Sequence, residues 1–406
     1  MTFARRSLTR EQIFYLLQTY GSPLYVYDEE TLRLRCQEMK KLVDAENFEV
    51  HFSAKANTNV ELLKIIRAEG LKVDAISPGE IYLEELAGFT SDDIMFVSNN
   101  ISAAEMKQVA NKDIYISLDS LNQLDTWGQI NPGSEVCLRI NTGIGTGFDD
   151  KVITAGEHTK FGIDPDELDE ARAVADRYNL KITGLNHHVG SLFLEGTEFL
   201  AAAERLLQIA AGFTGLRLID LGGGFGIPYA KNSESRLDLQ QLGARLSKIF
   251  SDWVDSHYPV RLVIEPGRYI VAESGVLLAT VTSIKKTKQH KYIGCDAGFN
   301  TLIRPAFYGS YHEVEIAARD PSSSSAATEK VTLVGPICES GDVLASERLL
   351  PACRKQDAVI IYDTGAYGYA MSSTYNSRPR PAEVLIDQQG EVRLIRPAER
   401  LTDLYR

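Results

Sequence analysis

The feature that most constrains the fold is a regular alternation of short apolar, β-branched runs with amphipathic stretches, from about residue 48 to 265. We predict eight strands here, at residues 48–53, 71–76, 94–97, 114–118, 135–140, 182–188, 216–221 and 261–264. Helical stretches lie between them, as at 60–69, 79–86, 103–110, 166–177, 197–211 and 237–254. Strands that alternate with helices are typical of parallel α/β folds. Eight such units predict a (β/α)8 barrel, whose active site lies at the C-terminal strand ends.

The chain after Arg268 has a different pattern, in which strand-like runs recur without helices between them. These runs lie at 275–284, 291–295, 312–316, 331–334, 358–362, 383–386 and 392–395. A similar run at 24–27 precedes the barrel and is expected to complete the same sheet. At 406 residues the chain exceeds the size at which one core usually keeps growing. We therefore predict a barrel domain over 31–270 and an all-β domain, sandwich-like or barrel-like, built from 1–30 and 271–406.

Composition excludes several classes of function. The net charge of -12, from 43 basic and 55 acidic residues, argues against a nucleic-acid binder. No apolar run is long enough to span a membrane, and no apolar stretch follows the two arginines at the N-terminus, so a secretory signal is not expected. The five cysteines lack Cys-x-x-Cys spacing, which indicates neither a zinc site nor a disulfide framework. We expect a cytoplasmic protein without a metal, whose partners are small molecules.

Lys55 ends the first predicted strand, within the stretch HFSAKAN at 51–57. An amine placed where a buried strand opens into a loop can lose solvation and condense with an aldehyde, which is how enzymes hold pyridoxal phosphate. The alternative for a lysine taken alone is a packed aliphatic stem whose amine reaches water. The residues at the other strand ends favour the first interpretation.

Chemically apt side chains follow the other predicted strands at the same ends. They include Asp74 on strand two, Arg139 on strand five, His187 and His188 at the end of strand six with Ser191 after it, Gly222, Gly223 and Gly224 after strand seven, and Glu265, Gly267 and Arg268 after strand eight. Because the C-terminal ends of barrel strands share one rim, we expect these residues to form one site with Lys55.

The glycine run lets backbone N–H groups approach a phosphate, and the loops after strands seven and eight are a recurrent phosphate site in such barrels. A tight turn that requires positive φ is the alternative. A dinucleotide-binding motif fits less well, because the last glycine of Gly-x-Gly-x-x-Gly would fall at Ile227.

Glu265 and the histidine pair each leave two interpretations open. Glu265 is suited to keeping a pyridine nitrogen protonated, with a salt bridge to Arg268 as the alternative. Alternation along a strand sends one of His187 and His188 inward and the other toward the helices, which disfavours a metal pair. The inward imidazole either stacks on a cofactor ring or is a hydrogen-bonded core residue.

Over nearly its whole length the chain resembles the diaminopimelate decarboxylases, which are alanine-racemase-like enzymes of fold type III that depend on pyridoxal phosphate. In the barrel, the matching stretches are SAKAN at 53–57, HVGS at 188–191, GGGF at 222–225 and EPGR at 265–268. In the second domain they are RPAFY at 304–308, GPICESGD at 335–342, GAYG at 365–368 and YNSRP at 375–379. The resemblance implies a homodimer with shared active sites, which decarboxylates meso-2,6-diaminopimelate to L-lysine and carbon dioxide.

The resemblance also implies a role for each matching residue. Lys55 would form the Schiff base with the cofactor, His188 would stack on its ring, and Glu265 would contact its pyridine nitrogen. The remaining cofactor-binding residues would be Asp74, Arg139, Ser191, Gly223, Gly224, Gly267, Arg268 and Tyr367. The substrate's distal carboxylate would be held by Arg268, Arg304 and Tyr308, its distal ammonium by Glu339, with Tyr367 also at the substrate. Cys338, catalytic together with Lys55, His188 and Glu265, would come from the second chain of a head-to-tail dimer; a small buried thiol is its alternative.

Three positions depart from the usual family pattern. Asn186 stands where a second histidine is common, Thr142 replaces a frequent proline, and Phe148 lies where a histidine-bearing loop is often found. The alternatives for the activity are the same chemistry on arginine or ornithine, an amino-acid racemase, and a non-catalytic regulatory homologue that binds pyridoxal phosphate. Two arginines and a glutamate suit a distal amino-acid group, whereas ornithine would require acids there.

Overall fold

The computed structural model describes residues 8–323 and 327–405. The chain divides into two compact units. The barrel unit contains Arg35–Pro228 and Ser235–Ile270. The β unit contains the segment up to Leu34, the short segment Tyr229–Glu234 and the chain from Val271 onward. No helix within the described ranges is long and apolar enough to cross a membrane.

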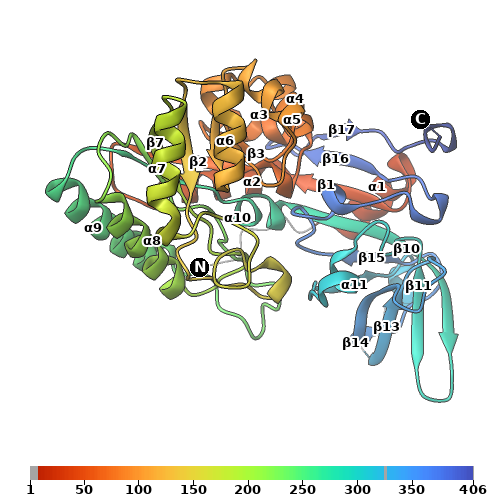
Figure 1. Cartoon of the computed structure of the whole chain (residues 1–406). Coiled ribbons are helices and arrows are strands. Elements are labelled where there is room, and N and C mark those ends of the chain that lie inside the picture. The colour runs from red at the N-terminus through yellow and green to blue at the C-terminus, as the bar shows by residue number, and fades with distance from the viewer. Residues whose placement is uncertain (1–7, 324–326, 406) are drawn as a thin grey trace. The chain divides into compact units, whose positions relative to one another are not determined.

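The barrel unit is a closed barrel of eight parallel strands that are adjacent in the order in which they occur along the chain. The strands are β2 (Phe48–Ser53), β3 (Lys72–Ala75), β4 (Ile94–Val97), β5 (Tyr115–Leu118), β6 (Glu135–Arg139), β7 (Lys181–Asn186), β8 (Leu218–Asp220) and β9 (Arg261–Ile264). The barrel closes where β2 pairs with β9, with Phe48 opposite Leu262. The predicted (β/α)8 barrel is therefore confirmed (Figure 1).

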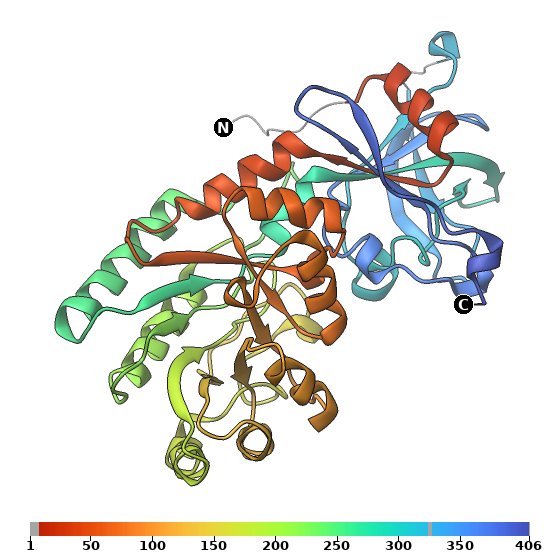
Figure 2. The same ribbon diagram turned by 90° about the horizontal axis from the view of Figure 1, so that it is seen from above.

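Helices surround these strands, as the view from above shows (Figure 2). They are α3 (Val60–Ala68), α4 (Pro78–Ala87), α5 (Ala103–Ala110), α6 (Leu121–Ile130), α7 (Leu168–Arg177), α8 (Thr197–Ala210) and α9 (Leu239–Ser256), while α2 (Glu29–Lys40) and α10 (Arg268–Val271) contain boundaries between the units. Many begin at a short polar residue whose side chain accepts a backbone N–H, as Ser77 does for α4 and Ser120 for α6. The sequence pattern missed α6, because its buried face is narrow and includes a glutamine, Gln123.

The β unit is built on a nine-stranded sheet with the order β14-β13-β11-β10-β1-β16-β17, in which β15 also pairs with β10 and β12 with β15. Its strands are β1 (Leu24–Asp28), β10 (Gly275–Lys286), β11 (Lys291–Cys295), β12 (Val314–Ala317), β13 (Thr328–Val334), β14 (Val343–Pro351), β15 (Ala358–Ile361), β16 (Ala382–Ile386) and β17 (Val392–Arg396). The expected place of 24–27 in this sheet is confirmed, because β1 pairs with β10 and β16. The helix α1 (Arg10–Tyr20), which the pattern did not predict, packs Ile13 and Leu16 on its core.

Candidate active site

Lys55 lies in a short 3-10 turn, η1 (Ala54–Ala56), directly after β2. Beside it, the hydroxyl oxygen of Ser53 lies 2.5 Å from Asp74 Oδ2 and 3.0 Å from the carbonyl oxygen of Glu265, so its proton is donated to one of these at a time. Burial and the nearby Glu265 raise the pKa of Asp74 to about 7, against the opposing effect of Lys55. The ends of β2, β3 and β9 thus meet around an amine and two buried carboxyls.

Glu265 follows β9 and is 4% exposed. Burial and the nearby Asp220 raise the pKa of Glu265 well above its usual range, and Lys55 acts in the opposite direction. Its Oε1 has no hydrogen-bond partner among the described residues. A buried carboxyl ionises when a cation comes close to it, and a protonated pyridine nitrogen is such a cation.

Asp220, at the end of β8, is a buried site residue to which the motifs gave no role. It accepts the N–H of Gly222 at 2.8 Å and the Nδ2–H of Asn186 at 2.8 Å. Burial raises the pKa of Asp220 to about 7. Asn186, one of the three departures from the family pattern, therefore supplies a hydrogen bond to this carboxyl. The signal that pointed to Asp220 was its position at a strand end, separated from the glycine run only by Leu221.

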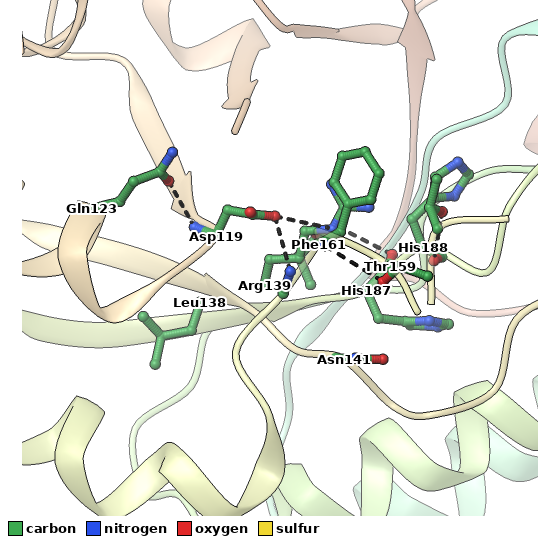
Figure 3. Close-up of polar contacts among 12 residues, drawn as sticks. Asp119, Gln123, Leu138, Arg139, Asn141, Thr159, Phe161, His187 and His188 are labelled. Atoms are coloured by element: carbon green, nitrogen blue, oxygen red, sulfur yellow. Dashed lines mark hydrogen bonds and ion pairs between the residues drawn. The ribbon is translucent and has the colours of Figure 1, made fainter. Parts of the chain in front are cut away.

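The two adjacent histidines have different surroundings, and their rings point in different directions (Figure 3). The fully buried ring of His187 has no hydrogen-bond partner in the part of the chain that the structure describes, and burial lowers its pKa to about 3. His188 accepts the N–H of Gly223 at Nδ1, over 3.1 Å. Burial and the nearby Lys55 lower the pKa of His188 well below its usual range. His188 is therefore a neutral, flat ring with its proton on Nε2, which suits stacking on an aromatic cofactor.

Arg139, the last residue of β6, is held by a cluster that the motifs missed (Figure 3). Its Nε lies 3.7 Å from Asp119 Oδ1, and its Cζ lies 4.5 Å from the ring centroid of Phe161. Asp119 also accepts the N–H of Gly162 at 3.1 Å, and its own N–H donates to Gln123 Oε1 at 2.9 Å. Asp119 thereby ties Arg139 and the backbone at 162 to the barrel rim. Its position directly after β5 could have identified it.

The glycine run after β8 has the conformation of a close-packed loop. Gly222 and Gly224 have φ values of +66° and +103°, which favour glycine. A Cβ atom at Gly223 would collide with the carbonyl oxygen of Glu265, so a side chain there would displace the backbone. The loop therefore brings bare backbone to the same rim as Lys55.

Arg268 begins α10, and its Nη2 donates to Ser191 Oγ over 2.9 Å. The Cζ of Arg268 lies 5.4 Å from the ring centroid of Phe148, a second departure from the family pattern, which places an aromatic ring against this guanidinium. The preceding Gly267 is packed closely, because a Cβ there would lie 3.0 Å from the Cβ of Ser53. Arg268, Ser191 and Gly267 thus also belong to the rim.

The other predicted site residues belong to the β unit. Arg304 and Tyr308 begin and end the short helix α11 (Arg304–Tyr308), and Arg304 is 1% exposed. Tyr367 has a φ of +57° in the loop after β15. Cys338 and Glu339 lie on the exposed loop between β13 and β14.

Four hydrogen bonds order the loop that carries Cys338 and Glu339. The Cys338 N–H donates to Asn376 Oδ1 at 3.1 Å, and the Tyr375 hydroxyl donates to Glu339 Oε1 at 2.5 Å. Asp342, at the end of the same loop, accepts two backbone N–H groups at 2.6 and 2.7 Å. The Cys338 thiol is exposed. The hydrogen bonds therefore fix the backbone of this loop, which carries the thiol of Cys338 and the carboxylate of Glu339.

The groups on the barrel rim fit pyridoxal phosphate. Lys55 offers the amine for its aldehyde, and the unpartnered oxygen of Glu265 offers an acceptor for its ring nitrogen. The neutral His188 offers a face for the ring, and the glycine loop with Ser191 offers donors for the phosphate. Bound there, the cofactor would supply an electron sink for a bond broken at the substrate's α-carbon.

Known proteins resemble this chain in both sequence and structure. Residues 29–272 match the family of the pyridoxal-dependent decarboxylase, pyridoxal binding domain. The chain is 39% identical to the diaminopimelate decarboxylase of Methanothermobacter thermautotrophicus, over 96% of this chain and 92% of that protein. A crystal structure of diaminopimelate decarboxylase has a TM-score of 0.89 at 35% identity, over 100% of this chain and 97% of the other. For the Helicobacter pylori enzyme complexed with L-lysine the TM-score is 0.89 at 29% identity, over 97% and 98% of the two chains. This chain therefore belongs to the diaminopimelate decarboxylases, a family of enzymes that depend on pyridoxal phosphate.

Proposed function

We propose that this enzyme decarboxylates meso-2,6-diaminopimelate to L-lysine and carbon dioxide, the last step of lysine biosynthesis. The observation that carries the proposal is the cluster of Lys55, Asp74 and Glu265 at the rim of the barrel, in a chain 39% identical to a diaminopimelate decarboxylase. The ligand named for the Helicobacter pylori relative, L-lysine, is the product of this reaction.

The barrel residues would bind the cofactor and set its charge. Lys55 would hold the aldehyde of the cofactor, His188 would stack on the ring, and Glu265 would keep the ring nitrogen protonated. The proton that replaces the lost carboxylate would come from Cys338, Lys55 or a water.

The distal end of the substrate carries both a carboxylate and an ammonium group. Arg268, Arg304 and Tyr308 would bind the carboxylate, and Glu339 the ammonium, because charge-assisted hydrogen bonds to both groups are strong and directional. Ornithine and arginine lack the distal carboxylate, so these arginines favour diaminopimelate over either.

We further propose a cytoplasmic homodimer in which Cys338 and Glu339 of one chain complete the site of the other. The exposure of both residues on an ordered loop supports this, since neither is needed to fill a core. The five cysteines form no disulfide with one another among the described residues, a state that a reducing compartment would preserve.

The substrate is tested by measuring carbon dioxide release from purified, cofactor-loaded protein with meso-diaminopimelate, its LL isomer, ornithine, arginine and lysine. We expect turnover of the meso isomer, with every other compound slower by at least about 100-fold, the factor that loss of one or two charged contacts produces. Comparable release from ornithine or arginine would contradict the substrate. Cofactor binding without release from any compound would favour the non-catalytic alternative.

Mixing two inactive variants tests the shared site. We expect Lys55→Ala protein and Cys338→Ala/Glu339→Ala protein to be inactive alone and active after subunit exchange. In a mixed dimer one of the two sites keeps every residue, so about half of the normal activity per dimer should return in that species. Activity is measured after exchange is verified with differently tagged chains; verified exchange without recovery would refute the shared site.

A further inference from the structure

Within the β unit, a histidine, His312, contacts the guanidinium of Arg304. The two hydrogen bonds of the His312 ring determine which of its nitrogens carries a proton. Arg304 Nη1 lies 2.8 Å from Nε2 of His312, and Nδ1 of His312 lies 2.8 Å from the carbonyl oxygen of Tyr362. A carbonyl only accepts and a guanidinium only donates, so Nδ1 carries a proton and Nε2 does not. His312, with no exposed surface, is therefore neutral in this arrangement.

An aromatic ring makes a second contact with the same guanidinium. The Cζ of Arg304 lies 4.6 Å from the ring centroid of Tyr229, which is 3% exposed. The rings of Tyr229 and His312 meet edge to face, with centroids 5.1 Å apart at 72°. Tyr229 begins Tyr229–Glu234, the segment that follows β8 in sequence but belongs to the β unit.

These two contacts orient the guanidinium, and neither of them adds a negative charge beside it. An imidazole nitrogen and a phenol ring both attract a cation, yet neither carries a negative charge. A carboxylate in the place of His312 would form an ion pair with Arg304 and compete with any carboxylate that arrives from a ligand. Neither of these two contacts therefore competes with a carboxylate that arrives from a ligand.

We propose that His312 and Tyr229 are positioning residues that hold Arg304 for the distal carboxylate of the substrate. The inference rests on the proposed role of Arg304 in the decarboxylation of diaminopimelate. Removing the acceptor Nε2 of His312, or the ring of Tyr229 beside Cζ of Arg304, keeps the positive charge of Arg304. The guanidinium then loses a contact that fixes its orientation. The consequence is a selective loss of affinity for ligands that carry the distal carboxylate.

Two probes isolate this effect in the cofactor-loaded enzyme. L-lysine keeps the distal carboxylate of diaminopimelate, whereas cadaverine has the same chain and amines without it. Inhibition constants of both are measured for His312→Phe, which removes the acceptor, and for Tyr229→Leu, which removes the ring. We expect L-lysine to bind about 10-fold more weakly to each variant, the effect of one charge-assisted contact, and cadaverine to bind within about 2-fold of wild type.

Conservative variants serve as matched controls. His312→Gln can place an amide oxygen near the Nε2 position, and Tyr229→Phe keeps the aromatic face, so both should bind L-lysine within about 3-fold of wild type. KM and kcat for meso-diaminopimelate are measured in parallel, and the loss should be mainly in KM.

Arg304→Met separates the inference from the function on which it rests. If Arg304→Met loses L-lysine affinity while His312→Phe and Tyr229→Leu keep it, the positioning role is wrong and the role of Arg304 stands. If Arg304→Met itself keeps L-lysine affinity, the proposed carboxylate site is wrong. Equal losses for L-lysine and cadaverine would indicate a merely structural role and overturn the inference. Should His312→Phe not fold, Tyr229→Leu and its phenylalanine control decide the question.

Discussion

Decarboxylation by the Lys55→Ala variant is expected to fall by at least about three orders of magnitude, as when a covalent catalytic residue is lost. Lys55 ends the strand that meets Asp74 and Glu265, and we expect no other lysine to reach the cofactor aldehyde from the rim. The visible absorption of the lysine-bound cofactor should disappear with the activity. Both are measured on protein incubated with pyridoxal phosphate.

Lys64→Ala is the matched control for this variant. The Lys64 amine pairs with Glu61 at 2.7 Å on the partly exposed surface of α3, so its removal should leave activity and absorption unchanged. A borohydride-reducible cofactor adduct in Lys55→Ala would show that another amine holds the aldehyde and would contradict the assignment.

Glu265→Gln is expected to lower kcat by about 100-fold or more, the usual effect of removing one preorganised electrostatic contact in an active site. The amide keeps the shape of the side chain but cannot take the negative charge that would hold the ring nitrogen protonated. The glycine loop and Ser191 remain, so affinity for pyridoxal phosphate should change much less than kcat. The two quantities are measured by steady-state kinetics at saturating cofactor and by cofactor titration.

Glu265→Asp serves as the conservative comparison, because it keeps the charge on a shorter side chain and should retain more activity than the glutamine variant. If Glu265→Gln lost affinity for the cofactor but turned over normally when fully loaded, the electronic role of Glu265 would be wrong.

The sequence alone determined the barrel and the chemical character of its rim. The spacing of apolar residues that distinguishes a strand from a helix involves residues only a few positions apart. Eight strand-helix units could therefore be recognised without any tertiary contact. In a parallel barrel every strand ends at the same rim. The joint location of Lys55, Asp74 and Glu265 therefore followed from their strand-end positions, and the contacts through Ser53 agree with it.

Which side chains hold these residues in place depends on contacts between distant parts of the chain. Asp119 and Arg139 are 20 residues apart, Asp220 and Asn186 34 apart, and no local period relates either pair. The place of β1 between β10 and β16, and the membership of Tyr229–Glu234 in the β unit, likewise depend on long-range packing. Two side chains form a hydrogen bond only when they lie close together in space. A sequence pattern specifies that distance only where the two residues are neighbours along one helix or strand.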